Sequence, residues 1–250
     1  MTLMSPPSLP GPVAPILMHD LAGADDERRI SPFCWRIRMA MAHKGLTVQT
    51  LPWRMVEKEK IAASEAVTVP VIIDGGRTVG GSWPIAEYLD AAYPQAPLFE
   101  SAQARAYCLW IHHWTERVLH PLIVPIILED VLALLHPKDV AYFRLTREKA
   151  FGKPLEAVFD RSVEAFERLS RAFTPLRRLL QECPFIAGTR PAFGDYVVFG
   201  ALQWARCCSP QQILARKEDP MVAWFSRMLD LHNGLGRTAK AYPTLSDMND

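Results

Sequence analysis

The chain has 250 residues, 49% hydrophobic and 22% charged, which is typical of a globular protein with one large domain or two modest ones. The formal net charge of +1 gives no reason to expect a nucleic-acid or anionic-membrane surface. No apolar run approaches the roughly 20 residues of a membrane span, and no signal peptide is recognisable.

The five cysteines are consistent with a reducing compartment. Their number is odd and none forms a Cys-x-x-Cys pair, so the sequence suggests neither a disulfide framework nor a zinc module. We therefore expect no metal.

The first elements in chain order predict a parallel strand–helix–strand unit. Residues 1–13 are rich in proline and are expected to form a disordered lead-in. A strand is predicted at 16–21, a helix at 30–45 and a second strand at 46–51. This order implies a parallel pair of strands joined by a right-handed crossover. Residues 52–66 are expected to be irregular, with one or two helical turns.

The helix at 30–45 has clear start and stop signals. Ser31 is a good N-cap, Pro32 suits the first helical position and Gly45 suits the position after the last turn. A helix N-terminus stabilises an anion, so Ser31 is placed to hold a thiolate or an oxyanion. The alternative is that Ser31 is only a cap, which is a common role for serine.

The next segment contains a proline within a strand-like apolar run. Pro70 would interrupt a strand ladder, which indicates either an edge strand or a cis Val69-Pro70 bond that leaves the Val69 backbone free for a ligand. Residues 74–76 predict a hairpin turn. Ser82 is expected to cap a helix at 83–93, whose N-terminus is a second possible anion site.

The second half of the chain shows helical patterns only. Residues 102–135 predict a long helix, in which Pro121 and Pro125 introduce a kink. The kink is either a packing feature or the wall of a hydrophobic substrate pocket. His112 and His113 face different sides of this helix, and with no carboxylate expected at ligand spacing they do not predict a metal site.

The remaining helices are assigned from their patterns. Two helical stretches are predicted in 137–182, a buried helix in 193–208 and a final helix in 219–232. Asp195, near the start of the buried helix, is expected to pair with free amides. The tail at 241–250 is expected to be frayed.

The order of these elements and three short motifs resemble the glutathione transferases. The motifs are residues 31–36 (SPFCWR), 69–71 (VPV) and 82–89 (SWPIAEYL), and the first looks most like the bacterial β-etherases and their fungal relatives. The resemblance implies an α+β thioredoxin-like N-terminal domain followed by an all-α C-terminal domain. We place these at 14–94 and 102–240, with a linker at 95–101.

The resemblance also implies a function and a site. A cytoplasmic homodimer would use glutathione as co-substrate, activate its thiolate at Ser31 and direct it to a hydrophobic aromatic molecule, with aryl-ether cleavage the specific expectation. Asp195 would have a structural role. The residues implied for glutathione are Val69, Pro70, Gly81 and Ser82, and those for the hydrophobic pocket are Phe33, Trp110 and Trp114.

One position departs from the family pattern. Relatives usually carry Asp or Glu at the position of Gly81, where the carboxylate meets the glutathione ammonium. Either another carboxylate replaces it, or glutathione binds weakly, which we expect. Gly81→Asp would tighten binding unless the backbone requires a positive φ.

Two rival functions remain open. The chain could be a thiol reductase using Cys34, although in such enzymes the nucleophilic cysteine normally occupies the position of Ser31. It could also be a non-catalytic binding protein on the same fold.

Overall fold

The fold consists of a small mixed sheet covered on one side by helices. The computed structural model describes residues 15–214, 216–245 and 247, so the predicted lead-in at 1–13 lies outside the described residues. The strand order is β2-β1-β3-β4, and β1 runs parallel to β2 and antiparallel to β3, which pairs with β4 in turn. The strands are β1 (Ile16–Leu21), β2 (Val48–Trp53), β3 (Val71–Asp74) and β4 (Arg77–Gly80).

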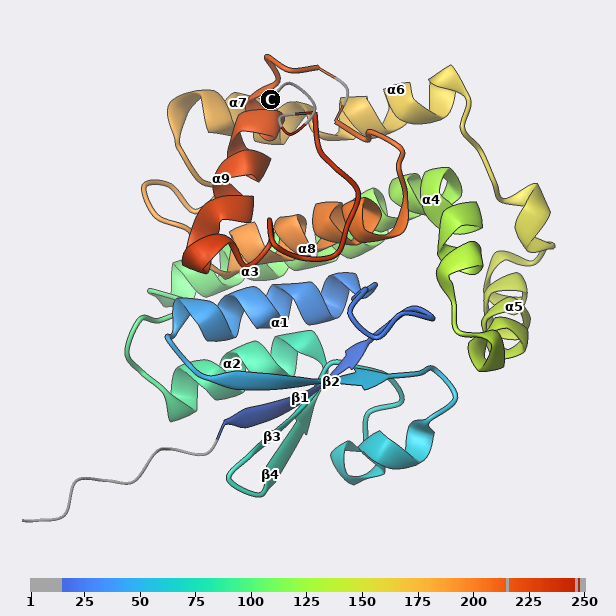
Figure 1. Ribbon diagram of the computed structural model, residues 1–250. Coiled ribbons are helices and arrows are strands. Elements are labelled where there is room, and N and C mark those ends of the chain that lie inside the picture. Colours follow the sequence, from blue (N-terminus) through green and yellow to red (C-terminus); the bar gives the residue numbers. More distant parts are fainter. Residues whose placement is uncertain (1–14, 215, 246, 248–250) are drawn as a thin grey trace, which may run out of the picture.

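Two helices of this half lie between the sheet and the helical half of the molecule (Figure 1). They are α1 (Pro32–His43) and α2 (Ser82–Ala92), and a 3₁₀ segment, η1 (Lys58–Ser64), follows β2. The predicted βαβ unit and hairpin are confirmed, as is the thioredoxin-like fold of this half.

The regular structure of the second half is helical among its described residues, apart from an isolated β-bridge between Phe185 and Gly188. Its long helices are α3 (Ala102–Trp114), α4 (His120–Leu134), α5 (Pro137–Phe151), α6 (Val163–Ala172), α7 (Thr174–Glu182), α8 (Phe193–Cys208) and α9 (Pro220–Gly234). None of the helices that the structure describes is long and apolar enough to cross a membrane.

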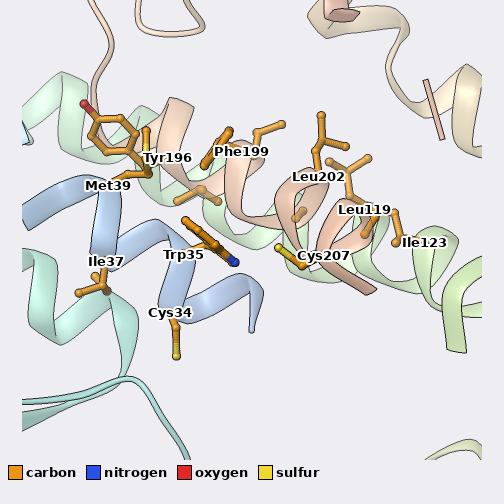
Figure 2. Close-up of a cluster of buried hydrophobic side chains, with 14 of the residues drawn as sticks. Cys34, Trp35, Ile37, Met39, Leu119, Ile123, Tyr196, Phe199, Leu202 and Cys207 are labelled. Atoms are coloured by element: carbon orange, nitrogen blue, oxygen red, sulfur yellow. The ribbon is translucent and has the colours of Figure 1, made fainter. Parts of the chain in front are cut away.

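The main core lies where α1 packs against α8, the two helices that the sequence predicts as inward-facing (Figure 2). Trp35 is 1% exposed and meets Phe199 edge to face at 6.4 Å. Gly200 allows the close approach, because a Cβ there would collide with the carbonyl oxygen of Pro32. The tip of α1 is therefore held against the centre of the helical half.

Asp195 has the structural role that the sequence indicates. Its carboxylate is fully buried and accepts from the amides of Ile186 at 2.7 Å, Ala187 at 3.1 Å and Ala192 at 3.2 Å. The indole of Trp224 adds a fourth bond at 2.9 Å. These bonds tie the loop before α8, the first turn of α8 and α9 together.

Two boundaries in the first half differ from the prediction. The second strand begins at Val48 rather than Leu46, because the Leu46 amide instead closes the end of α1 by donating to the Met41 carbonyl at 3.0 Å. The strand continues through Pro52, which is tolerated because β2 is an edge strand. The second helix begins at Ser82, so Gly81 is its N-cap and the prediction of Ser82 as the cap is wrong.

The long helix predicted at 102–135 is divided by a π-helical segment, η2 (Thr115–Leu119), that separates α3 from α4, and Pro125 lies inside α4. The segment ends at Leu119, two residues before Pro121, which has no amide to donate to the preceding turn.

Two further predictions for the second half were wrong. Residues 137–182 contain α5, α6, α7 and a 3₁₀ turn, η3 (Leu155–Ala157), rather than two helical stretches. The described part of the tail is attached rather than frayed. The Tyr242 amide donates to the Arg206 carbonyl at 3.0 Å, and Arg28 lies over the Tyr242 ring.

Candidate functional site

Ser31 caps α1 as predicted. Its hydroxyl oxygen accepts from the Cys34 amide at 3.2 Å, and Pro32 occupies the first helical position. Because the oxygen already accepts a bond from the helix, the hydroxyl proton remains available for a second partner. Only 3% of Ser31 is exposed, so an anion bound at this proton would be largely removed from water.

The Val69-Pro70 bond is cis, which confirms the second of the two readings of this proline. The Val69 N–H and C=O have no hydrogen-bond partner among the described residues, whereas the Pro70 carbonyl accepts from the Gly81 amide at 2.9 Å. That bond brings the start of β3 next to the start of α2. The unpartnered backbone of Val69, just before the start of β3, can pair with an extended peptide in the manner of a strand.

Gly81 has φ +87°, a conformation that residues with a side chain rarely adopt. A Cβ at this position would also lie 3.4 Å from Cδ of Pro84. Tighter glutathione binding by Gly81→Asp was expected only if the backbone did not require a positive φ. Because it does, we no longer expect this substitution to raise the affinity for glutathione.

Ser82 lies in the first turn of α2 and is 6% exposed. Its hydroxyl oxygen accepts from Nη1 of Arg36 at 3.4 Å, which joins the N-terminal halves of α1 and α2. As with Ser31, this leaves the hydroxyl proton free to donate to an anion. The free amides of the first turn of α2 favour an anion at the same place.

Arg36 is the centre of a polar cluster that sequence reasoning missed. The residue is fully buried, and its Nη1 also lies 3.0 Å from Nδ1 of His112 and 3.2 Å from Oε1 of Glu116. The Arg36 Nε and Nη2 atoms have no partner within the described part of the chain. Burial lowers the pKa of Arg36 to about 10, so the group remains charged at neutral pH.

His112 has a carboxylate at ligand spacing, so the sequence-based prediction that it has none is wrong. Glu116 is four residues further along the helix, and its Oε1 lies 3.2 Å from Nε2 of His112. Burial, followed by the nearby charge of Arg36, lowers the pKa of His112 to about 4. No group of three or more His, Cys, Asp or Glu residues suited to a metal is present among the described residues.

A cavity of about 690 Å³ opens beside this cluster, between α4, α5 and η3. Its polar lining includes Glu116, His120 and Lys153, and most of the rest is apolar. Glu116 and His120 are four residues apart, a spacing that puts both side chains on one face of a helix, and both line this wall. The apolar lining residues are Pro121, Val124, Pro125, Phe151, Ala157, Val158 and Phe159.

The three residues predicted for a hydrophobic pocket are not brought together. Phe33 meets His120 edge to face at 5.5 Å, so it adjoins the cavity through that residue. Trp110 is 57% exposed and stacks on Trp114 at 6.2 Å, and neither of them lines this cavity. Helical spacing identified the aromatic stripe on α3 but could not tell which way that face of the helix points.

Cys34 is unsuited to nucleophilic chemistry. It is fully buried, and it points to the opposite side of α1 from Trp35 (Figure 2). Burial and the neighbouring carboxyl of Asp20 raise the pKa of the Cys34 thiol well above its usual range. A reactive cysteine needs exposure and a stabilised thiolate, and Cys34 has neither.

Two sequence-family profiles match the chain. The "Glutathione S-transferase, N-terminal domain" profile covers residues 27–97, and the "Glutathione S-transferase, C-terminal domain" profile covers residues 106–230. Together they include Ser31, the cis proline, α2 and the Arg36 cluster.

Curated relatives carry the same family name. The chain is 30% identical over 142 residues to "Glutathione S-transferase-like protein ustS" of Aspergillus flavus, covering 50% of this chain and 49% of that protein. The aligned part thus spans about half the length of that relative. It is 26% identical over 174 residues to "Glutathione S-transferase Z1" of Arabidopsis thaliana, covering 67% of each.

Solved structures share the fold over most of their length. Glutathione transferase GSTFuA3 of Phanerochaete chrysosporium superposes with a TM-score of 0.71 at 25% identity, covering 89% of this chain and 93% of that one. A glutathione S-transferase of Ceriporiopsis subvermispora, CsGST63524, solved in complex with glutathione, gives 0.73 at 23% identity, covering 88% and 96%.

Proposed function

Because the chain belongs to the glutathione S-transferase family, we propose that it binds glutathione at the tip of α1 and transfers it to a hydrophobic aromatic electrophile. The observation that carries this proposal is the cap of α1. The Ser31 hydroxyl has an unused proton at a helix N-terminus, where the dipole and a hydrogen bond both favour a thiolate.

The peptide part of glutathione would lie along the start of β3 and α2. The unpartnered backbone of Val69, next to the cis Pro70, supports strand-like pairing with the cysteinyl residue. The γ-glutamyl carboxylate would meet the Ser82 hydroxyl and the amides of the first turn of α2. Gly81 would contribute its backbone conformation rather than a side chain.

The electrophile would occupy the apolar part of this cavity, formed by α4, α5 and η3, because that lining supports an aromatic guest. In aryl-ether cleavage, the thiolate would attack the carbon that bears the ether oxygen. A carbon–sulfur bond forms, the carbon–oxygen bond breaks, and the aryloxide leaves and takes a proton from solvent. This specific reaction rests on the resemblance of residues 31–36 to the etherase group.

We also propose a homodimer that functions in the cytoplasm. On α3 the exposed rings of Tyr107 and Trp110 stack on each other and on the half-buried Trp114, and this aromatic patch supports an interface with a second copy, because a large exposed apolar patch usually marks a contact surface. Five free thiols support a reducing compartment. Light scattering tests the dimer: a monomeric mass at micromolar concentration contradicts it, and Trp110→Ser should shift the equilibrium toward monomer.

The function is tested in two steps. Calorimetry with glutathione should show saturable binding, which a protein that does not use glutathione would not show. Product formation from glutathione and a panel of β-aryl ethers and halogenated aromatics should then be followed by mass spectrometry. Binding without any conjugate would favour the non-catalytic alternative.

A further inference from the structure

We infer that Glu116 supplies the carboxylate that receives the ammonium of the γ-glutamyl group, the role that no side chain at position 81 can fill. The inference rests on the proposed function, and it names a binding residue that lies on the helical half of the molecule. The inference is based on one observation: Ser82 and Glu116 both contact the same nitrogen atom of Arg36.

The geometry places an anion site and a carboxylate side by side. Nη1 of Arg36 lies 3.4 Å from the Ser82 hydroxyl oxygen and 3.2 Å from Oε1 of Glu116. The γ-glutamyl group carries its carboxylate and its ammonium on a single carbon atom. A ligand whose carboxylate meets Ser82 therefore has its ammonium within reach of Glu116.

One carboxylate oxygen of Glu116 is held by its neighbours, and the other remains available to a ligand. Arg36 and His112 both contact Oε1, whereas Oε2 has no hydrogen-bond partner among the residues that the structure describes. The side chain is 29% exposed and lines the open cavity, so Oε2 is accessible to a ligand. A carboxylate with one fixed and one free oxygen suits a cation that binds from the cavity side.

The tautomer of His112 is fixed by its neighbours. Arg36 can only donate, so Nδ1 of His112 must accept from it, which puts the imidazole proton on Nε2 facing Glu116. Arg36 donates to Oε1 at 3.2 Å, and Nε2 of His112 lies at the same distance from that oxygen. They act as positioning residues for Glu116.

The other carboxylates around α2 are already engaged. Asp74 accepts from the hydroxyls of Tyr88 and Tyr93 at 2.7 and 2.6 Å. Asp90 pairs with Lys44 and accepts from two amides after α2, and Glu87 pairs with Arg105. Both bonds to Asp74 fall on Oδ2 and both bonds to Glu87 fall on Oε1, and neither carboxylate contacts Arg36 or Ser82 among the described residues. Glu116 is therefore the carboxylate that Arg36 links directly to Ser82.

Calorimetry with two peptides tests this assignment. One is glutathione and the other is glutaryl-Cys-Gly, which is the same molecule without its ammonium. The parent protein should bind glutathione at least about tenfold more tightly than the analogue, the scale of a charge-assisted hydrogen bond. Glu116→Gln should remove this preference by weakening glutathione alone, and the control Glu129→Gln, at an exposed ion pair on α4, should keep it.

A second variant covers the case in which Glu116→Gln fails to fold around Arg36. Glu116→Asp keeps the charge but shortens the side chain by one methylene group. The ratio of its affinities for glutathione and glutaryl-Cys-Gly should be several-fold lower than that of the parent. A preference unchanged from the parent in a folded Glu116 variant overturns the assignment, as does a parent that binds both peptides equally. If the parent binds neither peptide, the proposed function itself fails.

Discussion

Gly200 of α8 lies directly against the carbonyl group of Pro32 at the tip of α1. This contact joins the helical half to the residue that follows Ser31. The site at the tip of α1 therefore depends on the packing of two helices far apart in the sequence.

Gly200→Ala should lower the free energy of unfolding by about 1–3 kcal/mol, because the added methyl group collides with rigid backbone rather than a mobile side chain. Urea denaturation measures this. Gly194→Ala on the same helix is the matched control, since its methyl group would meet Sγ of Cys108 at an ordinary 3.5 Å. Equal effects of the two substitutions would show that the contact at Pro32 does not matter.

Ser31→Ala should raise the pKa of the glutathione thiol in the complex by about 1–2 units, since it removes a hydrogen bond to a charged sulfur. The ultraviolet absorbance of the thiolate, followed against pH, measures the shift. Ser162→Ala is the control, because Ser162 caps α6 by the same 3.2 Å bond to an amide three residues on. Both variants should lose about 1 kcal/mol of stability from the missing cap. If the glutathione thiol titrates identically in the two variants, Ser31 serves only as a helix cap.

Thiol labelling should distinguish Cys183 from the other cysteines. Cys34, Cys108, Cys207 and Cys208 are buried, and burial raises the pKa of each of these four thiols. A chromogenic disulfide reagent should react rapidly with about one thiol of the native protein, the half-buried Cys183, and with the rest only after unfolding. If rapid labelling persists in Cys183→Ser, another thiol is accessible, and Cys34 would again be a candidate nucleophile.

Stability should fall as the pH is lowered below about 6.5. Burial, followed by the charge of Arg36, lowers the pKa of His120 to about 3, whereas in the unfolded chain it is near 6.5. Between these values the unfolded chain binds the extra proton, so the native state loses stability with falling pH, by about 1–2 kcal/mol at pH 5. His120→Phe should lose less between pH 7 and 5 than the parent in urea titrations. The same substitution at exposed His113 is the control, and equal slopes for both variants would contradict the assignment.

Gly81→Ala should lower the free energy of unfolding by about 1–3 kcal/mol, because alanine is strained at φ +87°. Differential scanning calorimetry measures the loss. Gly194→Ala serves again as the control, since its backbone is helical. A variant as stable as the parent would mean that the loop before α2 can adopt another conformation, and Gly81→Asp would then become worth testing for tighter glutathione binding.

The part of this protein that the sequence alone predicted depends on local rules. Ser31, Pro32 and Gly45 bounded α1 because capping residues act within a single turn. The order of elements predicted the sheet, because a strand–helix–strand unit has few allowed connections. The cis bond before Pro70 was foreseen from a proline in an apolar run together with the family resemblance.

The tertiary structure decided what depends on contacts between distant residues. The direction in which Trp110 points follows from how α3 packs, which its helical spacing does not reveal. The backbone of Gly81 is held by its bond to Pro70 at the end of the β3–β4 pair, and the tail is held by Arg206. Arg36 and Glu116 are 80 positions apart, and burial of a guanidinium between three helices brings them together. Local propensity carries no information about such a pair, because only the packed interior removes the water that would otherwise solvate each charge.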